Sequence, residues 1–227
     1  MRLEKASYNA IKYACINFHY AKRIPVTRAA FSIFNNKNEW CGVICYGSGA
    51  GDKVAKHFNM KQGQCCELVR VALNGKQETT SKAVSLSLKI LKSQNPLIKL
   101  VYSYADVDQN HFGTIYQATN WIYLGQSNVY SAGFIINNKQ THRRSVSSKL
   151  KGKKLTLQNI HTYIDKNATE FFSDGKRKYV QIFDKSLLPL YQSLSKPYPK
   201  QAQEVNKDKH DAPCIEIGGS NPTLALN

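Results

Sequence analysis

Residues 67–104 decide the fold: ELVRVAL (67–73) is followed by SKAVSLSLKILK (81–92) and then by IKLVYSY (98–104). The first and last stretches are apolar and rich in β-branched or aromatic residues, which favours strands. In the middle stretch Val84, Leu88 and Leu91 recur at helical spacing, and Ser81 stands where a helix cap is expected. This order predicts a strand–helix–strand crossover within one sheet.

The flanking segments extend this unit. Residues 28–35 and 39–46 read as two strands joined by a turn, and residues 7–17 are compatible with a helix or a strand. Further elements are expected after the crossover unit, namely a helix at 112–120, strands at 121–124 and 179–183, and a helix at 185–194. The sequence therefore predicts an α/β (α+β) fold with a mixed central sheet flanked by helices.

Polar residues gather where the strand 98–104 ends. Ser103, Tyr104 and Asp106 lie at its carboxyl end, and open sheets bind ligands at that end of their strands. We therefore look for the chemistry of the protein there.

Charge indicates the kind of partner. The chain has 227 residues, with 32 Lys and Arg against 15 Asp and Glu, and a formal net charge of +17. Its length suits one domain, or one domain with an appendage. No apolar run is long enough to span a membrane, and the residues after Met1 do not form a signal peptide. We expect a soluble cytoplasmic protein with no membrane partner, and the excess of cations suggests a nucleic acid.

The cations are concentrated in one window. Residues 109–164 hold seven basic residues and no Asp or Glu. Such a stretch grips a phosphate backbone or is simply a solvated basic loop, and the absence of acids favours DNA binding. The candidate DNA-binding residues are Lys139, Arg143, Arg144, Lys149, Lys151, Lys153 and Lys154. Residues 200–227 are nearly neutral and rich in proline, and we expect a loosely ordered tail.

Motifs for a zinc site are missing. The six cysteines form no CxxC, and the histidines form no HxxxH or HExxH. The HxE and PCxxC signature of the zinc deaminases is absent as well.

Several blocks of the sequence resemble the Mom family of phage DNA-modification proteins. The longest runs from Ser103-Tyr104-Ala105-Asp106 through Asn110-His111-Phe112-Gly113-Thr114-Ile115-Tyr116-Gln117 to Gly125. ELVRVAL (67–73) and Phe18-His19-Tyr20 with Pro25 resemble two further blocks. Lys178-Tyr179-Val180 with Tyr198-Pro199-Lys200 is similar to a weaker C-terminal block, so that the resemblance covers roughly residues 10–200.

The resemblance implies a fold and a reaction. It implies a single catalytic domain over 1–199, related to the GNAT acyltransferases, with a basic insertion at about 137–155. It also implies conversion of adenine in double-stranded DNA to N6-carbamoylmethyladenine, which protects phage DNA from restriction in the host cytoplasm. Iron(II) is the cofactor that the family suggests.

The donor of the transferred group is left open. Ordinary GNAT enzymes carry RxxGxG or RxxGxA before the long helix, where backbone N–H groups cradle acyl-CoA. In this chain Asn74–Lys82 occupies that place and contains one glycine, so a conventional acyl-CoA donor is not predicted.

The resemblance assigns candidate catalytic residues, which are His19, Tyr20, Arg70, Ser103, Asp106, Tyr116 and Asn120. His19 and Tyr20 would act as base, iron ligand or stacking rings. Arg70 would pair with Asp106 or an anionic ligand, although strand alternation could equally point it to solvent. Asp106 would polarise the adenine amine, bind iron, or cap the next segment. Tyr116 would act as general acid and share a helix face with Asn120.

Two other functions fit parts of the sequence. Residues 44–51 form a strand and a glycine loop, which suits a S-adenosylmethionine-dependent adenine methyltransferase, but the (N/D)PP(Y/F) motif of such enzymes is absent. A non-catalytic basic DNA-binding protein would need none of the candidate catalytic residues.

Overall fold

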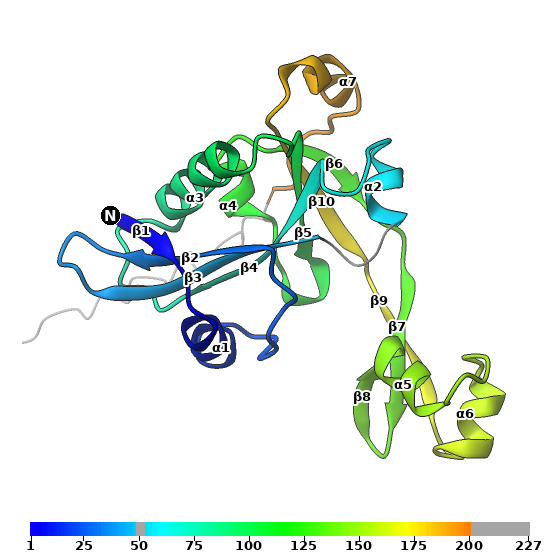
Figure 1. Cartoon of the computed structure of the whole chain (residues 1–227). Coiled ribbons are helices and arrows are strands. Elements are labelled where there is room, and N and C mark those ends of the chain that lie inside the picture. Colours follow the sequence, from blue (N-terminus) through cyan, green and yellow to red (C-terminus); the bar gives the residue numbers. More distant parts are fainter. Residues whose placement is uncertain (49–52, 201–227) are drawn as a thin grey trace, which may run out of the picture.

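The computed structural model describes residues 1–48 and 53–200. Its centre is a seven-stranded sheet in the order β1-β2-β3-β4-β5-β10-β6 (Figure 1). Every neighbouring pair is antiparallel except β4 and β5, which are parallel because α3 connects them. The strands are β1 (Arg2–Lys5), β2 (Ala29–Phe34), β3 (Trp40–Gly47), β4 (Cys65–Leu73), β5 (Leu100–Asp106), β6 (Ile122–Gln126) and β10 (Lys176–Ile182).

Helices cover both faces of this sheet. Figure 1 shows α3 (Thr80–Gln94) on one face and α1 (Tyr8–Asn17) on the other. Ala83, Val84, Leu88 and Leu91 of α3 pack into the largest core cluster, as their spacing predicted. The side chain of Thr79, and not that of Ser81, caps α3 by accepting a hydrogen bond from Lys82 N. The expected cap was therefore two residues too late.

The remaining helices are short. They are α2 (Lys53–His57), the 3₁₀ turn η1 (Val107–Gln109), α4 (Thr114–Gln117), the 3₁₀ turn η2 (Lys185–Leu187) and α7 (Leu188–Ser193). The helix predicted for 112–120 is correct only over α4. Gly113 before it and Asn120 after it both have positive φ, which limits the helical run.

The sheet opens between β4 and β5. Their parallel pairing covers only Cys65, Cys66 and Glu67 on β4, opposite residues 100–102 of β5. Beyond Glu67 the two strands diverge, although β4 continues to Leu73 and β5 to Asp106. This divergence leaves a gap at the carboxyl ends of the strands, where the sequence predicted the chemistry.

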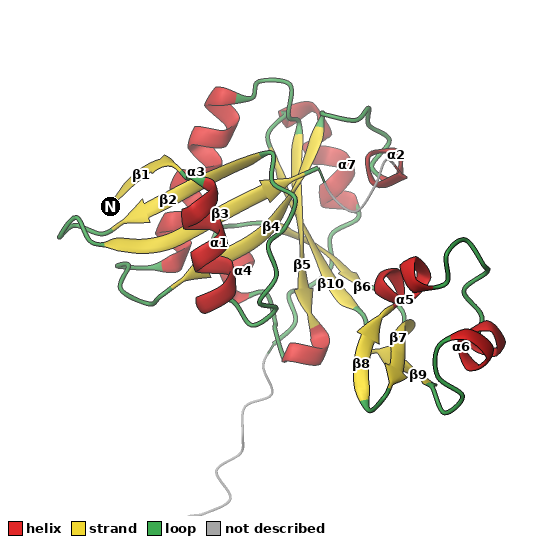
Figure 2. Ribbon diagram, turned by 60° about the horizontal axis from the view of Figure 1, so that its bottom comes forward, coloured by secondary structure: helices red, strands yellow, loops and turns green. Residues whose placement is uncertain are grey.

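A second, small sheet lies between β6 and β10 in the chain. It has the order β8-β7-β9 and consists of β7 (Tyr130–Ile136), β8 (Lys139–His142) and β9 (Thr169–Ser173). The helices α5 (Arg143–Lys149) and α6 (Leu157–Tyr163) pack on it around Phe134, Val146, Leu150 and Ile160 (Figure 2). We call residues 130–173 the small unit. It contains the whole basic segment 139–154, which is folded and has its own core.

The mixed sheet with helices on both faces confirms the predicted fold class. Within the described residues, no helix has the length and apolar character that a membrane span requires. The tail from residue 201 onward and residues 49–52 of the glycine loop lie outside the described residues.

Candidate active site

A cavity of about 410 Å³ fills the gap between the diverging strands. Its walls come from β4, from the end of β5 with the loop and helix that follow, and from the segment after α1. The lining residues are His19, Tyr20, Glu67, Leu68, Val69, Arg70, Val71, Tyr104, Ala105, Asp106, Asn110, His111, Phe112, Gly113, Thr114, Ile115, Tyr116 and Lys176. Five of the seven predicted catalytic residues are thus brought together.

A bulge in β4 shapes one wall of the cavity. Cys45 pairs with Arg70 whereas its neighbour Tyr46 pairs with Leu68, so Val69 is an extra residue. Before the bulge Leu68 faces the core under α3, and after it Val71 does. Glu67 precedes Leu68 and Arg70 precedes Val71, so both point away from that core and face the same side of the sheet. Regular alternation without the bulge would place them on opposite sides.

Glu67 was not among the predicted site residues. Burial raises the pKa of its carboxyl, while the nearby charges of Lys176, Arg70 and Arg144 and the Tyr102 hydroxyl act in the opposite direction. A signal was present in the sequence, because Glu67 is the one acid in strand 65–73, whose other residues are apolar except Arg70. A buried carboxyl in such a strand needs a functional reason.

Arg70 is half-buried in the cavity wall and does not form the expected ion pair with Asp106. Its Nη1 donates to the carbonyl of Val69 at 2.7 Å, and its Nε is buried without a hydrogen-bond partner. The ion pairs of the described residues do not include it. The expected pairing with Asp106 is therefore not formed, and binding of an anionic ligand by Arg70 stays a prediction.

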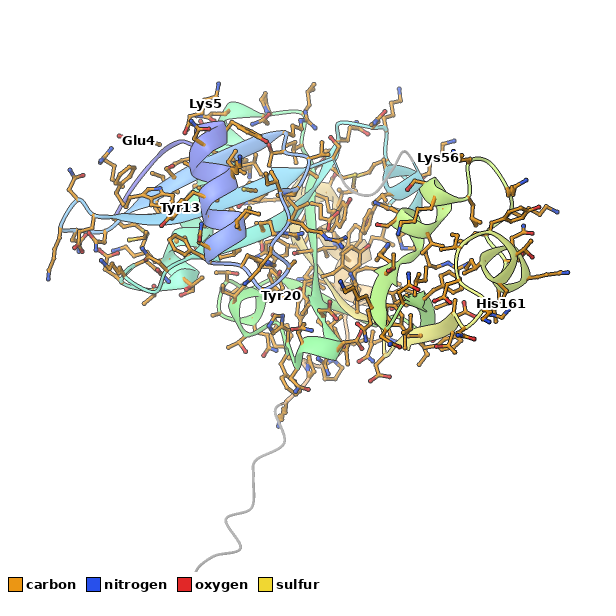
Figure 3. All side chains as sticks on the ribbon, turned by 90° about the horizontal axis from the view of Figure 1, so that it is seen from below. Glu4, Lys5, Tyr13, Tyr20, Lys56 and His161 are labelled. Atoms are coloured by element: carbon orange, nitrogen blue, oxygen red, sulfur yellow. The ribbon has the colours of Figure 1, made fainter. Side chains whose placement is uncertain are left out.

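His19, Tyr20 and His111 form an aromatic group at the cavity. The rings of His19 and Tyr20 stack with centroids 4.4 Å apart, and the ring of His111 meets Tyr20 edge-on at 5.4 Å. Tyr20 is 52% exposed and lies at the surface in Figure 3. The group can extend a stack onto a nucleobase.

His19 is neutral at physiological pH. Burial, followed by the charges of Arg70 and His111, lowers its pKa to about 4. Its Nδ1 accepts a hydrogen bond from Ala21 N at 3.1 Å, so the ring proton is on Nε2. In this state Nε2 of His19 carries the ring proton and is able to donate a hydrogen bond.

Ser103 lies behind Tyr116 and not in the cavity wall. Its Oγ donates to the carbonyl of Leu68 at 2.8 Å and lies 2.8 Å from the Tyr116 hydroxyl. Because Ser103 has one hydroxyl proton, Tyr116 donates in the second bond. Burial raises the pKa of Tyr116 to about 12, so its hydroxyl stays protonated and offers a lone pair to a ligand. Ser103 is therefore a positioning residue.

Asp106 begins the loop that closes the cavity. Its Oδ1 accepts from Asp108 N at 3.2 Å and caps η1, which confirms one of its three predicted roles. The other end of the loop is held by the Tyr179 hydroxyl, which donates to Phe112 O at 2.6 Å. Arg177 donates to His111 O at 2.7 Å, so β10 fixes the loop from outside.

Asn120 is outside the cavity. It is exposed and has a φ of 57°, in the turn between α4 and β6. The helix ends at Gln117, so Asn120 does not share a helical face with Tyr116, and that prediction is wrong.

Most of the predicted DNA-binding cations are exposed on the small unit. Lys139, Arg144, Lys149, Lys151, Lys153 and Lys154 are exposed, and Lys153 lies over the ring of Tyr163. Arg143 is different, because it pairs with Glu170 at 2.8 Å and lies 5.4 Å from the centroid of Phe134. Arg143 therefore stabilises the small unit.

The donor types around the cavity suit iron, but their arrangement does not form a site. His19, Glu67, Asp106 and His111 all line the cavity. Across residues 1–48 and 53–200, no three His, Cys, Asp or Glu side chains come close enough to hold a metal ion. Binding of iron by His19 and Asp106 stays a prediction, and no step below depends on iron.

Fold and cavity together define an α/β protein with a charged, aromatic-lined pocket between two diverging strands. The model of the Mom protein family matches residues 1–200. The chain belongs to the Mom protein family, as its motifs predicted, and this membership supports a phage DNA-modification protein.

Similar solved structures are acetyltransferases. A spermidine/spermine N-acetyltransferase from Vibrio cholerae aligns at 10% identity and a TM-score of 0.41, over 83% of this chain and 95% of that chain. An acetyltransferase of the GNAT family from Bacillus cereus aligns at 11% identity and a TM-score of 0.36, over 80% and 96%. No curated protein matches the chain.

Proposed function

We propose that this protein is a transferase that converts adenine in double-stranded DNA to N6-carbamoylmethyladenine and so protects phage DNA from restriction. The observation that carries the proposal is the assembly of the cavity. His19, Tyr20, Arg70, Asp106 and Tyr116 come from separate segments of a Mom family chain and line one pocket.

The pocket supplies groups that the reaction needs. A C–N bond forms between N6 of adenine and the methylene carbon of the donor, N6 loses a proton, and the leaving group departs with its bonding electrons. Asp106 is the proposed acceptor of that proton, and Tyr116 the proposed contact of the amine or the leaving group. The exocyclic amine is weakly nucleophilic and lies in the base stack, so the base must be extruded and held by stacking. His19 and Tyr20 offer a stacked pair of rings for this purpose.

Double-stranded DNA is the proposed partner, and the small unit is its proposed grip. Arg144 at the start of α5 is close enough to the cavity to lower the pKa of Glu67. Cations on the small unit could therefore hold the backbone while a base occupies the cavity. No step of the proposed reaction depends on iron(II) or on a particular donor.

Mass spectrometry of nucleosides from DNA co-expressed with the protein tests the proposal. We expect an adenine adduct with the mass of a carbamoylmethyl group. A methyl adduct would identify a methyltransferase instead, and unmodified DNA would leave only a DNA-binding role. Either of these two results would contradict the proposal.

A further inference from the structure

One wall of the cavity places a hydrogen-bond acceptor beside a donor. An ionised Glu67 carboxylate only accepts hydrogen bonds, and the Arg70 guanidinium only donates them. The bulge at Val69 turns both side chains to the same side of β4, and both line the cavity.

The two groups do not satisfy each other. Neither Glu67 nor Arg70 takes part in an ion pair with a described residue, and Nε of Arg70 is buried without a hydrogen-bond partner. Opposite charges that line one buried wall without pairing are costly unless a ligand engages them. The ligand that fits carries a donor next to an acceptor.

We propose that Glu67 and Arg70 read the amidine edge of a base that is turned into the cavity. Glu67 accepts from the exocyclic amino group, and Arg70 donates to the neighbouring ring nitrogen. This inference rests on the proposed function, because it states which bases the modifying site admits.

The order of the two groups decides which bases fit. Adenine and cytosine both present an amino group beside an unprotonated ring nitrogen. At the corresponding Watson–Crick positions guanine and thymine present the reverse, a carbonyl oxygen beside a ring N–H. In this cavity the carbonyl oxygen would meet the carboxylate and the N–H would meet the guanidinium, so two repulsive contacts would replace two hydrogen bonds.

A primary carboxamide offers the same pair of groups as an amidine edge. The carbamoyl part of a donor is therefore a second source of this chemistry. A binding experiment on unmodified DNA without any donor distinguishes the two sources, because only the base can then respond.

The test compares labelled duplexes that differ only at one target position, which holds A, C, G, T or no base. An abasic site opposite the target removes pairing, so extrusion costs little for each base. By fluorescence anisotropy we expect the A and C duplexes to bind at least about tenfold more tightly than the G and T duplexes. In Glu67→Gln this difference in affinity between the two pairs of duplexes should shrink to about threefold or less, because the amide both donates and accepts hydrogen bonds.

Two measurements control this experiment. Affinity for the duplex without a target base should be the same in wild type and Glu67→Gln, which shows that the variant is folded and still grips DNA. Glu4→Gln, on the edge strand β1 (Figure 3), makes the same change of charge away from the cavity. This variant should keep the full difference in affinity between the A and C duplexes and the G and T duplexes.

Equal affinity of the wild type for all four bases would overturn the inference. An undiminished difference in affinity between the bases in Glu67→Gln would overturn it as well. The proposed function can fail separately. Protein that modifies adenine in cells but does not discriminate between bases contradicts only the edge reading. Protein that discriminates between bases but leaves no adduct contradicts only the proposed reaction.

Discussion

At the scale of single residues, Glu67 destabilises the fold and is also the proposed contact of the extruded base. Its carboxyl is held in a wall of the cavity, where burial raises its pKa. The folded protein therefore disfavours the charged form, and ionised Glu67 destabilises the fold. Groups placed for binding often carry such a cost, because a ligand repays it only when it is bound.

Glu67→Gln should stabilise the protein in a pH-dependent way. The folded pKa of Glu67 lies above the unfolded value, so its destabilising effect is full above the folded pKa. Below the ordinary glutamate pKa of about 4.3 both states are protonated and the effect is gone. Thermal melts should show a higher Tm than wild type at about pH 7.5 and little difference at about pH 4. An equal shift at both pH values would contradict this explanation.

The sequence proposed cavity residues where a family motif was present, as at Asp106 at the end of β5 and at Arg70 in the middle of β4. It marked Glu67 as the one acid of its strand but not as a neighbour of Arg70, because regular alternation places positions 67 and 70 on opposite faces and only the bulge brings them together. The prediction that Asn120 shares a helix face with Tyr116 was wrong for a related reason. The spacing of four from Tyr116 has meaning only within a helix, and the helix ends at Gln117.

At the scale of elements, the loop between β5 and α4 depends on one glycine. Gly113 has a φ of 74°, and a Cβ atom there would lie 2.4 Å from the ring of Tyr179. That ring belongs to the side chain whose hydroxyl holds Phe112 O. This close packing fixes the part of the cavity wall that Phe112 and Gly113 form.

Gly113→Ala should displace this loop. Positive φ in a residue other than glycine costs about 1–3 kcal/mol, and the contact with Tyr179 adds to it. We expect a lower Tm and loss of most DNA-modifying activity. Gly152→Ala is the matched control, since φ there is also positive but nothing lies within 4 Å of the added Cβ. Equal activity loss in both variants would refute a specific role of the contact with Tyr179.

Six of the seven strands of the main sheet were predicted, because apolar runs mark them, whereas β1 has the sequence RLEK and no such run. The strands of the small unit were not, since β8 and β9 are short and their exposed positions dominate. Its core comes from six residues spread over 134–168, a separation that no local pattern reveals.

At the scale of the whole molecule, the small unit joins the main body beside the cavity. Ser127 N donates to Lys176 O at 3.0 Å, and Asp174 N donates to Oδ1 of Asp108 at 2.9 Å. Ser127 and Asp174 flank the small unit on either side, so both bonds hold its connecting segments to β10 or to the loop after β5. Figure 2 shows the small unit beside the end of β10 and β6. DNA held by the small unit would therefore lie near the pocket.

Replacing Lys149, Lys151 and Lys154 by Gln should weaken DNA binding and flatten its salt dependence. Each lost phosphate contact lowers the slope of log K against log salt by about one. Replacing the exposed Lys5, Lys12 and Lys89 by Gln removes the same charge from the main body and should leave the slope unchanged. Equal slopes in the two triple variants would contradict the proposed grip.

Arg143→Ala should instead lower the stability of the small unit, by about 1 kcal/mol at most.

The most direct test of the account is quantitative mass spectrometry of adenine nucleosides from DNA co-expressed with Asp106→Asn. Asparagine keeps an oxygen to cap η1 and removes only the charge, so the fold is preserved. We predict that the carbamoylmethyl adduct falls at least about 100-fold, while Asp108→Asn, which leaves the cavity intact, retains it. Full modification by folded Asp106→Asn would contradict the assignment of this cavity as the active site.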